Sequence, residues 1–156
     1  MIDMKYWLLK SEPGDYSIDD LQSDKVTPWD GVRNYQARNM MRDDMKIGDK
    51  VLFYHSNAGD ETGVVGEAKV ASDALVDVTQ FDKKDSHYDP KATRENPRWW
   101  CPEVEFVSKF KTTVTLEELK CSPAFTDSRL TKKGNRLSVV PVTKKQYEAV
   151  VKASNN

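Results

Sequence analysis

The chain has 156 residues, of which 31% are charged and 38% are hydrophobic, and its formal net charge is −1. This length suits one domain with a substantial core, and the composition is that of a globular protein. No apolar run approaches the roughly 20 residues that a membrane-spanning helix needs, which excludes an integral helical membrane protein. The near-zero net charge argues against a protein that coats polyanions through bulk attraction.

The N-terminal residues lack a basic stretch followed by an apolar core, so we expect no export signal and an intracellular location, cytoplasmic if the source is bacterial. The two cysteines, Cys101 and Cys121, are 20 positions apart, and only His55 and His87 could join them as ligands. We therefore expect two reduced thiols, no metal site and no cofactor.

The first part of the chain contains one apolar run and two helix-start signals. Residues 6–9 are aromatic and apolar and stop at Ser-Glu-Pro-Gly, which predicts a buried strand followed by a turn. Ser17 can cap a short helix over 17–21, whose early acidic residues suit the positive end of the helix dipole. Asn34 predicts a second helix that runs through about residue 42 toward residue 45.

The middle of the chain is strand-like. Residues 51–55 and 63–70 predict two strands, which the polar segment 56–62 joins as a hairpin. Residues 82–98 are polar and contain two prolines, which predicts a long loop. Loops of this length in small domains often cover or build a binding site.

The last third alternates strands and helices. Residues 103–110 alternate apolar and charged side chains, which predicts a strand with one solvated face. Thr115 and Thr143 each precede a Glu or Gln at capping-box spacing, which predicts two helices. Between them, 136–142 predicts a strand in which Pro141 fits best near an edge or end. The fold class is α+β, a curled, mainly antiparallel β-barrel or sheet with flanking short helices, and we expect one domain over 1–156.

Basic residues are in excess in segments 31–57 and 98–156. A folded surface could therefore present one basic face, although ordinary solvated charge is the alternative for each residue taken alone. The residues that would form this face are Arg33, Arg38, Arg42, Arg129, Lys132, Lys133 and Arg136.

Polar-aromatic clusters at 6–13, 29–39 and 51–56 are the main functional signal. Flat aromatic faces beside amide, hydroxyl and guanidinium groups suit a planar, hydrogen-bonding ligand such as a nucleobase. Trp7 lies inside an apolar run and is assigned to the core. Trp29 stands among turn-forming residues and is either a ligand-facing ring or a structural plug. Alternation points one of Trp99 and Trp100 inward and the other outward.

No phosphate-loop, dinucleotide, serine-hydrolase or zincin motif is present, which favours a binding function over catalysis. The best enzymatic candidate is Lys10-Ser11-Glu12, where an amine, a hydroxyl and a carboxylate stand together at a strand end. A turn held by Ser11 and Glu12 is the simpler interpretation.

The chain resembles the EVE domain family through segments 6–13, 29–39, 53–56, 63–66 and 136–142, which span nearly the whole sequence. The resemblance implies a PUA-like fold and a non-catalytic module that binds nucleic acid carrying a modified base. A modified cytosine in DNA is the candidate ligand, with RNA left open. The physics is coherent, because a closed pocket can recover the cost of unstacking a flipped base.

The resemblance also supplies ligand-binding candidates. Trp29 and Tyr54 are expected as walls, Ser11 and Asn34 as readers of the base edge, and Arg38 as a phosphate contact. The full set is Lys10, Ser11, Trp29, Asn34, Arg38, Tyr54, His55, Ser56 and Ser138, where Lys10 is a second phosphate contact.

Two alternatives stay open. One is a small hydrolase of a modified nucleoside or amide that uses Lys10 and Glu12, and the other is a protein-interaction module with a degenerate pocket. The binding hypothesis predicts that Trp29→Ala abolishes binding of modified oligonucleotides while leaving thermal unfolding nearly unchanged. The sequence does not specify the oligomeric state.

Overall fold

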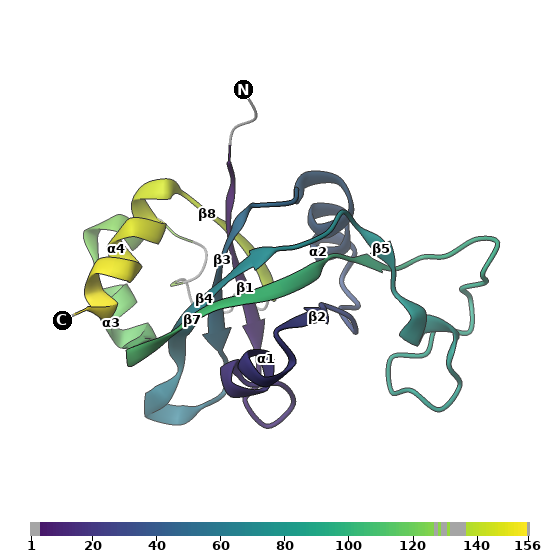
Figure 1. Cartoon of the computed structure of the whole chain (residues 1–156), viewed down its shortest axis with the longest axis horizontal. Coiled ribbons are helices and arrows are strands. Elements are labelled where there is room, and N and C mark those ends of the chain that lie inside the picture. Colours follow the sequence, from purple (N-terminus) through teal and green to yellow (C-terminus); the bar gives the residue numbers. More distant parts are fainter. Residues whose placement is uncertain (1–3, 127, 129–130, 132–136, 156) are drawn as a thin grey trace.

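The computed structural model describes residues 4–126, 128, 131 and 137–155. Its main feature is a six-stranded sheet with the strand order β2-β7-β4-β3-β1-β8 (Figure 1). The β1–β3 pair is parallel, and the other neighbouring pairs are antiparallel. These strands are β1 (Tyr6–Ser11), β2 (Val26–Pro28), β3 (Lys50–His55), β4 (Gly63–Val70), β7 (Glu103–Thr115) and β8 (Val139–Val142).

The sheet curls into a half-barrel whose outer strands, β2 and β8, do not pair with each other. This arrangement confirms the predicted α+β class and the mainly antiparallel pairing. Pro141 lies in the edge strand β8. An edge strand pairs on one side only, so no second strand needs the backbone N–H that proline lacks. The predicted strand over 136–142 is described from residue 137 onward, and Arg136 lies outside the described residues.

Each predicted helix begins at its predicted cap. Ser17, Thr115 and Thr143 form capping boxes, and the Asn34 side chain accepts from the backbone N–H of Ala37. The helices are α1 (Ile18–Asp24), α2 (Tyr35–Asn39), α3 (Leu116–Lys120) and α4 (Lys144–Ser154). None of the helices in these described ranges is long and apolar enough to cross a bilayer.

The central strands bury side chains on both faces. In β1, Trp7 and Leu9 pack into one cluster with α1 and α2, whereas Leu8 packs into a second cluster with α3 and α4. Figure 1 shows α3 and α4 together on one side of the sheet and α2 on the other. The prediction of Trp7 as a core residue is confirmed, and its indole N–H donates to the buried carboxylate of Asp49 at 2.9 Å.

A glycine allows two strands to approach closely at an irregular register. A Cβ on Gly66 of β4 would lie 2.5 Å from the backbone oxygen of Ser108 in β7, which is too close for any side chain. The register of β4 against β7 shifts beside this glycine. The resulting bend helps to curl the sheet.

Several elements were not predicted. Strand β7 continues beyond residue 110 to Thr115, and β2 was not recognised. Helix α2 leads into a π-helical turn, η1 (Met40–Asp44). The described residues also contain a small two-stranded sheet and 3₁₀ turns, formed by β5 (Leu75–Val76), β6 (Trp100–Cys101), η2 (Gly59–Glu61), η3 (Val78–Phe81) and η4 (Pro123–Phe125).

Candidate functional site

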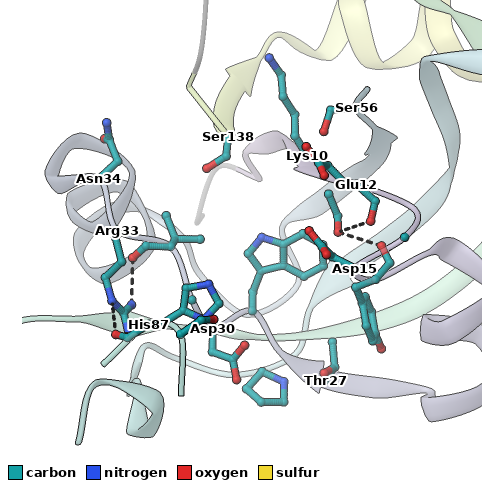
Figure 2. Close-up of a pocket in the computed structure, with 18 of the residues that line it drawn as sticks. Lys10, Glu12, Asp15, Thr27, Asp30, Arg33, Asn34, Ser56, His87 and Ser138 are labelled. Carbon is teal, nitrogen blue, oxygen red and sulfur yellow. Dashed lines mark hydrogen bonds between the residues drawn. The ribbon is translucent and has the colours of Figure 1, made fainter. Parts of the chain in front are cut away.

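A cavity of about 1250 Å³ opens where the C-terminal ends of β1 and β2 meet the long loop after η3. Figure 2 shows Lys10, Ser56 and Ser138 on one side of it, and Arg33 and His87 on the other. The lining residues are Lys10, Ser11, Glu12, Gly14, Asp15, Tyr16, Thr27, Pro28, Trp29, Asp30, Gly31, Val32, Arg33, Asn34, Ser56, Asn57, Ser86, His87 and Ser138.

Trp29 is both a core residue and a wall of the cavity. Only 7% of it is exposed, and its ring packs edge-on against Phe53 at 5.4 Å and Tyr16 at 6.4 Å between ring centroids. These contacts fix the indole in one orientation. The burial also overturns the expectation that Trp29→Ala would leave thermal unfolding unchanged, because that substitution would leave a large void in the core.

The indole N–H of Trp29 is free to meet a ligand. The indole N–H groups of Trp7 and Trp99 donate to Asp49 and Asp89, whereas that of Trp29 has no partner in the described part of the chain. No fully buried side-chain nitrogen or oxygen there lacks a partner. The Trp29 N–H must therefore reach solvent, and the cavity is the space that Trp29 lines.

A buried ion pair holds the segment after Trp29. The Asp77 carboxylate accepts from the backbone N–H of Gly31 at 2.8 Å and from the Arg33 guanidinium at 3.0 Å. The Arg33 guanidinium also donates to the backbone oxygen of His87. Burial would raise the pKa of Asp77, but hydrogen bonds from Thr79, Gly31 and Arg33 outweigh it and hold that pKa below its usual range.

This ion pair places His87 in the cavity wall. The His87 ring lies against Gly31, so closely that a Cβ on this glycine would come within 2.9 Å of the ring. Gly31 also has a φ of +82°, a conformation that disfavours any other residue. Asp85 accepts from the backbone N–H of His87 at 2.8 Å. The predicted loop over 82–98 thus contributes Ser86 and His87 to the cavity.

Asp30 supplies a carboxyl group beside Trp29. Desolvation and then the negative charges of Asp77 and Asp85 raise its pKa, and the nearby His87 and Arg33 only partly oppose this. Asp30 accepts no hydrogen bond from another described side chain or backbone group, so its oxygens remain available to a ligand.

Lys10 lies on another side of the cavity. Its ammonium lies 5.5 Å from the centre of the Tyr54 ring, and it forms no ion pair with a described residue. Burial lowers its pKa. Lys10 thus belongs to the cavity lining, but its ammonium is directed toward Tyr54, which does not line the cavity.

The structure brings together six of the nine predicted ligand-binding residues. Ser11 donates to the backbone oxygen of Tyr16 at 2.8 Å, and the Asn34 oxygen caps α2, which leaves its amide N–H groups. The Ser56 and Ser138 hydroxyls have no partner within the described ranges. The six lining residues are Lys10, Ser11, Trp29, Asn34, Ser56 and Ser138.

Tyr54, His55 and Arg38 do not line the cavity. Tyr54 is 3% exposed and belongs to the second core cluster, on the α3–α4 face. The His55 imidazole accepts from the first backbone N–H of α1, at Ile18, through Nε2 at 3.1 Å, and burial lowers its pKa. Arg38 lies on α2, over the Tyr35 ring.

The residues of the enzymatic alternative are engaged elsewhere. Glu12 accepts from the Asn57 amide, and Lys10 lies over Tyr54, with no contact between the Lys10 and Glu12 side chains. The Ser11 hydroxyl donates to a backbone oxygen rather than to a base. This arrangement lacks the nucleophile–base contact that acyl transfer requires.

Sequence reasoning did not select Asp30 or His87. Asp30 lies inside the polar-aromatic cluster 29–39, between Trp29 and a glycine, and that position was the available signal. His87 had none, because its place depends on the contact between Gly31 and a loop more than 50 positions away along the chain.

Comparison with known proteins gives consistent matches along the chain. A rat protein, thymocyte nuclear protein 1, is 40% identical over 166 residues, which cover 94% of this chain and 72% of that protein. A crystal structure of a Pseudomonas syringae protein superimposes with a TM-score of 0.91 at 42% identity, covering 96% of this chain and 99% of that one.

The structure of the human THYN1 protein, in complex with DNA that contains 5-methylcytosine, superimposes with a TM-score of 0.86 at 38% identity. It covers 97% of this chain and 98% of the human one. The family model of the EVE domain matches residues 5–153. On these matches, the chain belongs to the EVE domain family.

Proposed function

We propose that this protein binds DNA without catalysis and holds a modified cytosine in the cavity beside Trp29. The observation that carries the proposal is the indole N–H of Trp29, which has no partner among the described residues and belongs to the lining of a polar cavity of about 1250 Å³. Small-molecule pockets typically measure about 300–1,000 Å³, so this one has room for a nucleotide. The 5-methylcytosine DNA complex of the human relative supports the same class of ligand.

The polar groups match the edge of a cytosine. Cytosine presents an amino donor at N4 and acceptors at N3 and O2, so its pocket needs an acceptor and donors. Asp30 provides the acceptor, and the Trp29 N–H and the Ser56 and Ser138 hydroxyls provide donors. An ionised carboxylate accepts from the cytosine amino group but repels the O4 oxygen that thymine has in its place.

The test measures the affinity of the purified protein for single-stranded oligonucleotides that differ at one base. Single strands remove the cost of opening a base pair from the comparison. Burying a methyl group contributes about 0.8 kcal/mol, so 5-methylcytosine should bind about four-fold more tightly than cytosine. Thymine carries the same 5-methyl group and should bind more weakly than 5-methylcytosine. Equal affinities for the three oligonucleotides would contradict the proposal.

Asp30→Asn is expected to stabilise the protein while weakening its preference for 5-methylcytosine over thymine. The folded state raises the pKa of Asp30 above its ordinary value of 3.8, so unfolding releases a proton at pH values between 3.8 and the pKa of the folded state. Stability from this group is complete at low pH and is lost as the pH rises through the folded pKa. The asparagine variant should therefore melt at a higher temperature at pH 7, and the gain should shrink on acidification.

Thermal scans across pH 4–7 and the oligonucleotide series together check this expectation. An amide can either donate or accept, so it should not reject the thymine edge as a carboxylate does. A variant that melts below the wild type at pH 7, or keeps the wild-type preference, would contradict the assignment of Asp30.

A further inference from the structure

Arginines and aromatic rings form a layered surface beside the cavity. The Tyr35 and Trp99 rings stack at 4.9 Å and 19°, and the Arg38 guanidinium covers Tyr35 at 4.7 Å. Arg33 lies over the Trp99 ring at 5.1 Å. We name this surface the arginine ladder, and it consists of Arg33, Tyr35, Arg38, Arg42, Arg98, Trp99 and Trp100.

The helical geometry aligns the exposed part of the arginine ladder. Arg38 and Arg42 are four residues apart, across α2 and its π-helical turn, and share one face. Arg42 lies over the Trp100 ring at 5.4 Å, and Arg98 lies over Tyr35 at 5.8 Å. Three of the arginines predicted for a basic face thus lie here, whereas Arg129, Lys132, Lys133 and Arg136 fall outside the described residues.

The charge of Arg38 is not neutralised. Its guanidinium donates to the side-chain oxygen of Asn39 and to the backbone oxygen of Arg98, and it pairs with no described carboxylate. Arg98 has only a distant carboxylate, Asp89 at 3.9 Å, while Arg42 pairs with the exposed Asp43. Burial and then the charge of Arg42 lower the pKa of Arg38, which is consistent with an excess of positive charge at this position.

The arginine ladder is continuous with the cavity. Arg33 and Asn34 line the cavity and directly precede Tyr35, the first residue of α2. Figure 2 shows Asn34 at the edge of the cavity where this helix begins. A DNA strand that places one nucleotide in the cavity would therefore carry the neighbouring nucleotide over the arginine ladder.

We propose that the arginine ladder binds the sugar-phosphate backbone of the DNA strand whose modified base occupies the cavity. This inference rests on the proposed function. The Arg38 guanidinium is held by stacking and by neutral acceptors, so it is preorganised to donate to phosphate oxygens. Contacts with phosphate carry no sequence information, so the surface adds affinity without base preference.

The test compares Arg38→Ala with Arg94→Ala, using oligonucleotides with and without 5-methylcytosine over a range of salt concentrations. Arg94 is a matched control, because it also covers an aromatic ring, Phe81 at 4.8 Å, but does not line the cavity or join the ladder. On these single strands, loss of one phosphate contact lowers the salt slope by about 0.7, equivalent to about five-fold in affinity at 0.1 M salt. Arg38→Ala should show this loss equally for both oligonucleotides, and Arg94→Ala should show none.

Three outcomes would overturn the inference: an unchanged salt slope for Arg38→Ala, an equal loss for Arg94→Ala, or a loss confined to the modified oligonucleotide. Arg38→Lys keeps the charge and should restore most of the slope, which separates a phosphate contact from a packing defect. Failure of the proposed function is a different result, namely a wild-type protein that does not distinguish the two oligonucleotides. The Arg38 comparison still decides the inference in that case.

Discussion

Trp29→Ala is expected to have the largest effect of any substitution in the cavity, on both binding and stability. Removing the indole N–H leaves an acceptor of the bound base unpaired, which costs about 1–3 kcal/mol, so the affinity for the base should fall by about 5- to 150-fold. The same change removes the contacts with Phe53 and Tyr16, and truncating a buried tryptophan costs about 3–5 kcal/mol of unfolding free energy. Urea unfolding and oligonucleotide titration measure the two effects.

Trp29→Phe separates binding from folding. Phenylalanine keeps an aromatic ring against Phe53 but lacks the N–H, so it should lose about five-fold in affinity with a smaller loss of stability. Trp7→Phe is the matched control, because its N–H donates to Asp49 in the core. That control should lose stability and keep its affinity. Wild-type affinity in Trp29→Phe would contradict a role for the indole N–H.

Asp77→Ala is expected to destabilise the fold by about 3–5 kcal/mol, because it leaves the partly buried guanidinium of Arg33 without its carboxylate. It also removes the acceptor of the Gly31 and Thr79 backbone N–H groups. Hydrogen exchange should show loss of protection after residue 77, and DNA binding should fall because His87 loses its position. Urea unfolding measures the global change.

The control for this prediction is Asp43→Ala, which removes the same kind of pair from the surface. Asp43 contacts Arg42 at 2.8 Å, but its side chain is 53% exposed, so solvent screens the interaction. If Asp77→Ala left stability as unaffected as this control, the ion pair would not hold the loop.

Local signals in the sequence predicted most of the fold. The caps at Ser17, Asn34, Thr115 and Thr143 depend on residues within one turn, so the pattern alone specifies where each helix begins. The hairpin between β3 and β4 follows from two apolar runs and a short polar link. Strand β2 gave no such signal, because three residues that include a proline are too few to show alternation.

The cavity was less predictable because its geometry depends on distant contacts. Tyr54 faces the second core because neighbouring strand residues alternate between faces, and sequence did not specify which face the cavity shares. Arg33 was predicted as part of a basic face. The structure pairs it with Asp77, 44 positions away, a contact that no local pattern indicates.

The Asp77–Arg33 pair divides the cavity into parts that can change independently. One wall belongs to the sheet and its core, where substitutions at Trp29 carry a cost for folding. The other wall is the loop that carries His87, which the ion pair anchors where the loop begins. Insertions and substitutions around His87 should therefore have little effect on the barrel. Related proteins could in this way bind new ligands by changing this loop, while the Asp77 carboxylate keeps the loop attached to the rest of the cavity.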